Sequence, residues 1–336
     1  MLENADKSFG LECSPTDPRD AFPVDLRDAS VRARVVREGG LAPDRLEAIA
    51  ADLPHCVPFR YNRQTRRGAA FGPPPAGAFG VLLLGDSFTE GAGVVAKHTF
   101  ARRLETLLAH GQRRALVHNG GRRGRDLPAL VEDLERFLPL VEPDLVIYVF
   151  MLNDFEQGRA HRARQVFLND LVLDRQCTGR PTWKLPGILQ ASRLATALAA
   201  WWRRRTVTAE TIAWYRGMTG PDNREGWERT RRDLARMNDL ATRSGARFLV
   251  AVLPVLTGLD GDGNDYPFTE LHRDLCTACR KLGIRCVDLL EAFTGRPAAH
   301  LWVHPVDMHP NDEAHRIIAE ALAPIAADML GQGPGE

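Results

Sequence analysis

Five short apolar runs constrain the fold of this chain more than any other feature of its sequence. Each run is rich in Val, Ile or Leu and nearly uninterrupted, which is typical of strands covered on both faces. Their bounds are Val81–Leu84, Ala115–Val117, Leu145–Phe150, Phe248–Leu253 and Ile284–Val287. Helical patterns fill the intervals, and strands that alternate with helices predict a parallel sheet wrapped by helices.

The expected helices are the amphipathic stretches Thr99–Ala109, Leu127–Leu138, Trp227–Thr242 and Glu270–Leu282, with a last one after Asn311. In folds of this kind, ligands bind at the carboxyl ends of the strands. The first strand ends in the sequence GDSFTEG, residues 85–91. The pattern therefore places Ser87 at the edge of the sheet where ligands bind.

The regular pattern divides the chain into two predicted parts. Residues 1–78, rich in Asp, Arg and Pro with one helical stretch at Ala42–Leu53, are expected to form an N-terminal extension that packs on the core. Residues 79–332 are expected to form the main domain, and residues 155–226 interrupt it with an unusually long connection. This insertion is expected to be an added helical subdomain, or else a lid or surface helix that contacts acyl chains or a membrane.

Composition narrows the class of protein. The chain has 44% hydrophobic and 26% charged residues, as in ordinary globular proteins. Its net charge of +1 gives no overall field that would recruit nucleic acid or a membrane surface. The start of the chain lacks the apolar core of a signal peptide, and no stretch has the length of a membrane span. We expect a cytoplasmic protein, and the oligomeric state stays open.

The six cysteines do not suggest a disulfide framework in a chain of this length. They lie at positions 13, 56, 177, 276, 279 and 286. Cys276 and Cys279 have CxxC spacing, but they fall in a helical pattern without a second cysteine pair or a nearby histidine pair. Neither a metal site nor a redox site is therefore expected, and no cofactor is predicted.

Ser87 is a candidate nucleophile. A serine hydroxyl needs a base to remove its proton, and free backbone N–H groups at the start of a helix add a positive local field. The three residues Gly-Asp-Ser alone more often mark a turn. The GxSxG elbow of the α/β-hydrolases is absent, because Thr89 occupies the place of the second glycine.

His309 is the candidate base, because an imidazole titrates close to neutral pH. It lies in a turn just before the final helix, where Pro310 and Asn311 form a plausible helix start. Asp307, two residues earlier, is placed to orient the imidazole and stabilise its charged form. The remaining histidines considered are expected to be solvated, structural or decoys: His98, His110, His272, His304 and His315.

Acyl transfer also needs donors for the oxyanion that develops on the substrate carbonyl. Gly120 and Gly121 follow the second strand and let backbone N–H groups approach a ligand closely. Asn153 follows the third strand. Four strand ends and loops thus each carry one part of an acyl-transfer site. Arg122 and Arg123, beside Gly121, indicate either a charged substrate or two solvated side chains.

The order GDS, NxG, xxND and a C-terminal Asp-His pair resembles the SGNH hydrolases, the GDSL esterase superfamily, over about residues 81–330. Tyr61-Asn62 and Arg66-Arg67-Gly68 resemble the lead-in found in longer bacterial members. The resemblance implies a flavodoxin-like three-layer α/β/α sandwich and an enzyme that hydrolyses or transfers acyl groups, often acetyl groups on sugars.

The resemblance also implies a role for each matching residue. It makes Ser87 the nucleophile and an oxyanion donor, Gly121 and Asn153 further oxyanion donors, His309 the base, Asp307 its partner, and Asp86 the tie between the serine turn and its neighbouring loops. Asp86, Arg122 and Arg123 are candidate substrate-binding residues. Two departures stand out: Met151 replaces the glycine of GxND, and Val306 stands where the Asp three residues before His is usual.

Three functions follow from these residues. The first is a serine esterase or deacylase for a small-molecule or carbohydrate ester, working through an acyl-enzyme without metal or cofactor. The second is an acyltransferase with the same site, which differs in how well the pocket excludes water. The third is a non-catalytic binding module, which the altered blocks at Met151 and Val306 would suit. A nucleotide-binding protein is disfavoured, because no phosphate-binding glycine loop follows the first strand.

Overall fold

The computed structural model describes residues 2–3, 8–14, 24–51, 55–109, 114–155, 194, 212–213, 215–261, 265–304 and 307–331. Most of the insertion at 155–226 therefore lies outside the described residues, and so do the two interpretations of it, as a packed subdomain or as a lid.

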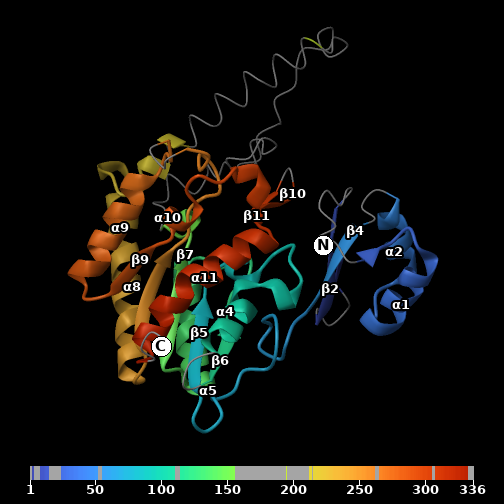
Figure 1. Cartoon of the computed structure of the whole chain (residues 1–336), viewed down its shortest axis with the longest axis horizontal. Helices are drawn as coiled ribbons and strands as arrows, with labels where there is room; N and C mark the ends of the chain where they lie inside the picture. Colours follow the sequence, from blue (N-terminus) through green and yellow to red (C-terminus); the bar gives the residue numbers. More distant parts are fainter. Residues whose placement is uncertain are drawn as a thin grey trace.

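A five-stranded parallel sheet forms the centre of the protein, with the strand order β6-β5-β7-β8-β9 (Figure 1). Its strands are β5 Phe79–Leu84, β6 Ala115–Asn119, β7 Leu145–Phe150, β8 Arg247–Val252 and β9 Arg285–Asp288. All six residues of β7 are buried, as expected for a strand covered on both faces. The order corresponds to the 2-1-3-4-5 arrangement of flavodoxin-like folds, so the predicted fold class is confirmed.

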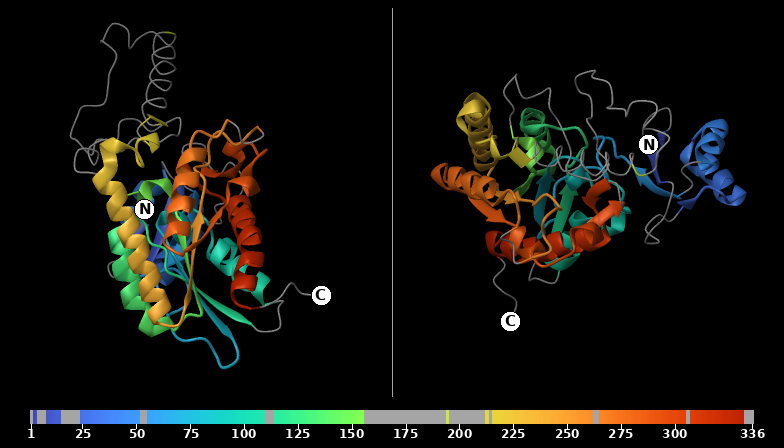
Figure 2. Two further views of the ribbon diagram at one scale, coloured as in Figure 1. Left: turned by 90° about the vertical axis from the view of Figure 1, so that its left-hand side faces the viewer. Right: turned by 90° about the horizontal axis from the view of Figure 1, so that it is seen from above.

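Helices cover both faces of the sheet (Figures 1 and 2). On one face, α4 (Phe100–Leu108) packs against α11 (Asp312–Met329). On the other, α5 (Leu127–Val141) packs against α8 (Arg224–Arg243), and α9 (Thr269–Lys281) lies beside α8. Because the helices cover the two faces, the loops that follow the strands gather at the carboxyl edge of the sheet.

Short elements fill those loops. They are α3 Ser87–Glu90, η1 Ala96–His98, η2 Leu152–Asp154, η3 Pro221–Asn223, α10 Leu290–Phe293, η4 Ala298–Leu301, and the strands β10 Trp302–His304 and β11 Asp307–Pro310, which pair as an antiparallel hairpin. Among the described residues, no helix combines the length and the apolarity needed to cross a bilayer.

The N-terminal part has a small sheet and an apolar core of its own. Its strands β1 Leu2–Glu3, β2 Phe9–Ser14, β3 Val24–Asp25 and β4 His55–Arg60 are antiparallel in the order β1-β2-β4-β3. The helices α1 Ala29–Gly39 and α2 Pro43–Ala50 pack beside this sheet, away from the central one (Figure 1). Leu11, Leu26 and Leu46 are fully buried in this second core. The sequence pattern predicted only the second of these helices.

Two disulfides correct the expectation that the cysteines form none. Cys13 joins Cys56 across β2 and β4, and Cys276 joins Cys286 between α9 and β9. Cys279 is a free and buried thiol, and burial raises its pKa to about 12, so the two cysteines of the CxxC sequence are not bonded to each other. Disulfides are more typical of proteins in oxidising compartments, and the cytoplasmic location expected from the sequence stays a prediction.

Candidate active site

The turn after β5 holds Ser87 at the start of α3. Gly85 has a φ of +156°, and a Cβ at this position would lie 2.1 Å from the hydroxyl oxygen of Thr89. The carboxylate of Asp86 accepts a hydrogen bond from the backbone N–H of Phe88 (2.9 Å) and so caps α3. The sequence Gly-Asp-Ser thus provides a turn that only glycine can enter, a helix cap, and a serine presented beyond it.

His309 meets Ser87 from the β10–β11 hairpin. Its Nε2 lies 2.8 Å from Ser87 Oγ. The imidazole also packs against the ring of Phe88, with 4.8 Å between the ring centroids. This is the geometry in which a histidine takes the proton of a serine hydroxyl.

Asn311 fixes the hairpin that carries His309. Its side-chain oxygen caps α11 by accepting from the backbone N–H groups of Glu313 and Ala314, both at 3.1 Å. Its side-chain amide donates to the backbone oxygens of His300 (2.8 Å) and Trp302 (3.2 Å). The predicted helix start at Asn311 is therefore confirmed, and the same residue ties the helix to the hairpin.

Asp307 lies in β11, where its backbone pairs with His304 of β10. The side chains of both residues lie outside what the structure describes. The role of Asp307 as partner of the base therefore stays a prediction.

Gly121 lies against α3. A Cβ here would lie 2.3 Å from the backbone nitrogen of Glu90, so the approach of the loop to the helix requires glycine. Asn119 spans the same gap, because its amide donates to the backbone oxygen of Thr89 (2.8 Å) and its side-chain oxygen accepts from the N–H of Gly121 (2.9 Å). The predicted oxyanion donor thus has a protein acceptor in this structure.

Asn153 reaches the same turn from the loop after β7. Its amide donates to Oδ2 of Asp86 (2.9 Å), which links the serine turn to that loop. Met151, at the place of the usual glycine, is buried, and its backbone N–H donates to Oδ2 of Asp154 (3.1 Å). The loop after β7 therefore accommodates methionine at this position and keeps both hydrogen bonds, from Asn153 to Asp86 and from Met151 to Asp154.

Two buried acids lie beneath this edge of the sheet. Burial raises the pKa of Asp86, although hydrogen bonds from Asn153 and Phe88 favour its charged form. Burial and the charge of Asp86 raise the pKa of Asp154 well above its ordinary range. Because one buried charge disfavours another nearby, the two acids oppose each other's ionisation beside the serine turn.

The sequence from residue 83 to residue 317 matches the GDSL-like lipase/acylhydrolase family. This chain belongs to that family. The match begins in β5, ends in α11, and contains Ser87, Gly121, Asn153 and His309. Membership supports a carboxylic ester hydrolase and confirms the resemblance found in the sequence.

Solved structures of esterases are similar to this GDSL-family chain at low identity. The structure of TesA is 15% identical, with a TM-score of 0.44, and the match covers 74% of this chain and 99% of that one. An acetyl-xylooligosaccharide esterase from Geobacillus stearothermophilus is 15% identical (TM-score 0.42; 80% and 100% covered). The esterase EstA from Pseudoalteromonas sp. is 13% identical (TM-score 0.43; 75% and 98% covered). No curated protein matches the chain significantly.

The two candidate substrate-binding arginines of this GDSL-family protein differ in their partners. Arg123 is paired with protein acids: its Nε lies 3.1 Å from Glu90 Oε2, and a terminal nitrogen lies 2.5 Å from Glu12 Oε1. The guanidinium of Arg122 instead lies 4.0 Å from the ring centroid of Tyr61, and no ion pair joins it to an acid of the described residues. Of the two, Arg122 therefore retains an uncompensated charge beside the Gly121 loop.

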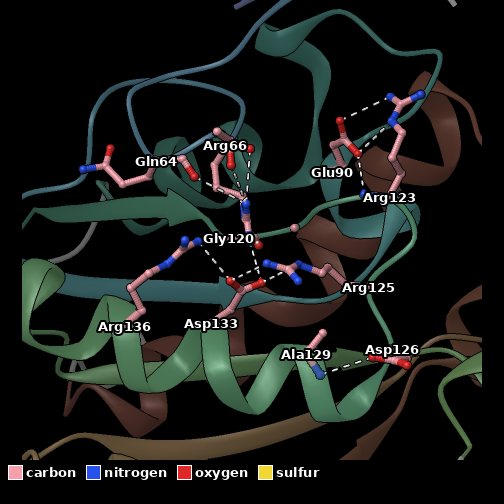
Figure 3. A network of polar contacts seen from close by, with 12 residues as sticks. Gln64, Arg66, Glu90, Gly120, Arg123, Arg125, Asp126, Ala129, Asp133 and Arg136 are labelled. Atoms are coloured by element: carbon pink, nitrogen blue, oxygen red, sulfur yellow. Dashed lines mark hydrogen bonds and ion pairs between the residues drawn. The ribbon is translucent and has the colours of Figure 1, made fainter. Parts of the chain in front are cut away.

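The arginines of the lead-in sequence are buried and bind the loops around Ser87. Figure 3 shows the first of them, Arg66, beside Gly120 and Asp133. Arg66 donates from Nε to the backbone oxygen of Gly120 (2.9 Å) and pairs with Asp133 of α5, which Arg125 and Arg136 also contact. Arg67 donates to the backbone oxygens of Gly91 and, at 2.8 Å, Val94, in the loop after α3. The lead-in thus holds both loops that flank the serine turn.

Sequence reasoning missed two buried polar side chains of this GDSL-family protein, Glu90 and His272. Glu90 is fully buried, accepts from the Arg123 backbone N–H (2.6 Å), and also contacts the Tyr61 hydroxyl. His272, expected to be solvated or at the edge of the core, is fully buried between Asp288 (Nδ1 to Oδ1, 2.8 Å) and the Tyr266 hydroxyl (3.1 Å). The local sequence carried no signal for His272, which lies among the charged residues of α9, and for Glu90 the signal was an acid directly before two small apolar residues. Among the described residues, no group of three or more His, Cys, Asp or Glu is arranged to hold a metal ion.

Proposed function

We propose that this protein is a serine-dependent ester hydrolase that works through an acyl-enzyme, with Ser87 as nucleophile and His309 as base. The observation that carries the proposal is the 2.8 Å distance between Ser87 Oγ and His309 Nε2, at the carboxyl edge of the sheet. His309 takes the hydroxyl proton while Oγ attacks the ester carbonyl. The imidazolium then gives that proton to the departing alcohol, and a water molecule releases the acyl group by the same steps.

The oxyanion formed in each attack needs donors, which we assign to the backbone N–H groups of Ser87 and Gly121 and to the amide of Asn153. The Gly121 N–H now bonds a neutral amide oxygen of Asn119 (2.9 Å), and a charged oxyanion is the stronger acceptor. An amide NH₂ carries two hydrogens, so Asn153 donates one to Asp86 and the other to substrate. Asp307 is assigned to orient His309, and Arg122 to contact an anionic group of the ester.

A fluorophosphonate tests the proposal directly. The activated Oγ attacks phosphorus, fluoride leaves, and the adduct is mapped by mass spectrometry. We expect the wild type to be labelled at Ser87 and both Ser87→Ala and His309→Ala to remain unlabelled while folding normally. A wild type that fails to react, with circular dichroism showing a folded protein, would support a binding module instead.

The acceptor of the acyl group is a separate question about the same site. A hydrolase passes the acyl group to water, and an acyltransferase passes it to a sugar or other hydroxyl that outcompetes water. With p-nitrophenyl acetate as donor, release of p-nitrophenol is compared with release of acetate in the presence of methyl glycosides. Equal release indicates hydrolysis, and a deficit of acetate matched by acetylated glycoside indicates transfer.

A further inference from the structure

Two residues of the small N-terminal sheet that face each other contact the catalytic part, on the same face as Phe59, whose ring lies 5.6 Å from the guanidinium of Arg123. Glu12 of β2 and Val57 of β4 are direct partners in the antiparallel register. Directly opposed residues of two strands project to the same face of a sheet. One face of this sheet is therefore turned toward the active-site loops, and the opposite face toward α1 and α2.

Glu12 contacts the loops around the helix α3, which begins with the proposed nucleophile Ser87. One carboxylate oxygen accepts from the backbone N–H of Gly93, in the loop after α3. The other lies 2.5 Å from a guanidinium nitrogen of Arg123. Arg123 in turn binds the last residue of α3, because its backbone N–H (2.6 Å) and its Nε (3.1 Å) both donate to Glu90. A single carboxylate thus holds the loop after the nucleophile helix and the loop that contains Gly121.

Val57 packs against the β10–β11 hairpin, which carries the proposed base His309. It is fully buried and packs in one cluster with Val303 of β10 and Val95. Strand β10 pairs with β11, the strand of His309. A Cβ at Gly93 would lie 2.3 Å from the side chain of Val303, so the loop after α3 and the β10–β11 hairpin also touch each other directly.

The Cys13–Cys56 disulfide fixes the register of the two contact residues. These cysteines are the neighbouring pair in the same ladder, one position along from Glu12 and Val57. They belong to the core beneath α1 and α2, on the opposite face of the sheet. The N-terminal sheet therefore presents a carboxylate and an apolar side chain at a fixed spacing to the two halves of the active site.

We propose that Glu12 is a positioning residue for catalysis, which holds the α3 and Gly121 loops in register with the hairpin of His309. The inference rests on the proposed function, since it concerns the geometry of the Ser87–His309 pair. Glu12 acts through Arg123 and Gly93 and does not touch the reacting atoms.

The test compares Glu12→Ala, Glu12→Gln and Asp25→Asn. The last is the matched control, because Asp25 forms an exposed ion pair with Arg27 in the same small sheet, away from the site. We measure the rate constant of fluorophosphonate labelling at Ser87, together with kcat and KM for p-nitrophenyl acetate, at a temperature well below the midpoint of thermal unfolding. Misplacement of reacting groups by about 1 Å costs up to about 100-fold in rate, so we expect a fall of tenfold or more for Glu12→Ala.

That fall should lie in kcat and in labelling, with KM within about twofold, because substrate contacts are unchanged. Glu12→Gln keeps the acceptor oxygen and should recover most of the rate, and Asp25→Asn should match the wild type. If Glu12→Ala lowers only the unfolding temperature while folded protein labels at the wild-type rate, the positioning role is wrong. Should that variant not fold, Val57→Ala replaces it, with a slower labelling rate expected and an unchanged rate contradicting the inference. Absence of labelling in the wild type would instead overturn the proposed function.

Discussion

Two histidines of this protein contact a hydroxyl group through Nε2, in two different surroundings. His309 lies 2.8 Å from Ser87 Oγ, on a short hairpin at the edge of the sheet. His272 lies 3.1 Å from the Tyr266 hydroxyl, within α9, and its Nδ1 contacts Asp288 at 2.8 Å. The contacts of this second site bring an acid, an imidazole and a hydroxyl together.

Burial separates the two. His309 and Ser87 are half-buried, whereas His272 is fully buried and Tyr266 nearly so. Burial also raises the pKa of Tyr266 well above its ordinary range, and its hydroxyl already accepts from the N–H of Val255 (3.0 Å). A hydrogen-bonded histidine and hydroxyl thus make a reactive pair only where substrate has access, and the buried set instead ties the loop after β8 to α9 and β9.

The different roles of His309 and His272 are tested most directly by removing each imidazole in turn. We expect His309→Ala to lower kcat/KM for ester hydrolysis by at least about 10³-fold, because His309 is the base that contacts Ser87 Oγ within the described part of the chain. Its urea midpoint should stay near that of the wild type, since the ring is half-buried. Steady-state rates of a preparation check the predicted loss of kcat/KM, and urea denaturation of the same preparation checks the unchanged midpoint. Equal activity losses in His309→Ala and His272→Ala would contradict the distinction between them.

The second prediction concerns the buried set. His272→Ala leaves the Asp288 carboxylate and the Tyr266 hydroxyl without this partner and opens a cavity, so we expect a loss of roughly 2–4 kcal/mol in the free energy of unfolding. Tyr266→Phe removes only the hydroxyl and should cost about 1–2 kcal/mol. Activity per folded molecule should stay within about threefold of the wild type in both. Urea denaturation and active-site titration with a fluorophosphonate give the two quantities.

A third histidine, His315, tests the effect of burial through the pH dependence of the protein's stability. His315 of α11 is fully buried, accepts from the N–H of Phe100 (3.1 Å), and burial together with the charges of Arg67 and Arg103 lowers its pKa to about 3. An unfolded histidine titrates near 6.5, so below that pH the unfolded chain binds a proton that the folded protein does not. Stability from this group is therefore present above pH 6.5 and lost as pH falls, by about 2 kcal/mol between pH 7 and pH 5.

The control for this prediction is His315→Gln, which keeps an acceptor for Phe100 but does not titrate. The wild type should lose about 2 kcal/mol more stability than the variant between pH 7 and pH 5, measured from urea midpoints. Parallel pH curves for the two proteins would show that the buried ring titrates normally.

The sheet was predictable because it depends on local pattern, and the meeting of Ser87 with His309 was expected from their places at the edge of that sheet together with the family resemblance. Strand β7 was expected at its observed bounds, Leu145–Phe150, since an uninterrupted apolar run between charged segments has few other uses. The ends of parallel strands then meet at one edge, which brings Gly121 and Asn153 toward the serine turn without further information.

What could not be predicted depends on pairs of segments far apart in the chain. Nothing in the neighbourhood of Glu12 indicates Arg123, and nothing near Cys13 indicates Cys56, because only the folded register of β2 and β4 brings them together. His272 shares helical spacing with solvated residues of α9, and its burial follows from β9 and the loop that carries Tyr266. Polar networks of this kind are set by three-dimensional packing, so sequence pattern alone does not reveal them.

The smallest predicted effect concerns Arg122, which pairs with no acid of the described residues, whereas Arg123 pairs with Glu12 and Glu90. A guanidinium that binds an anionic group of the substrate should distinguish a succinyl ester from an acetyl ester with the same leaving group. We expect Arg122→Ala to raise KM for the succinyl ester about fivefold to tenfold, which corresponds to about 1–1.4 kcal/mol, and to leave KM for the acetyl ester within about twofold. Arg122→Lys should keep part of the preference, because it retains charge without the planar fork. Arg122 also stacks on Tyr61, so its removal can lower stability. If Arg122→Ala lowers the unfolding temperature and changes KM for both esters by the same factor, Arg122 serves packing and does not bind an anionic group of the substrate.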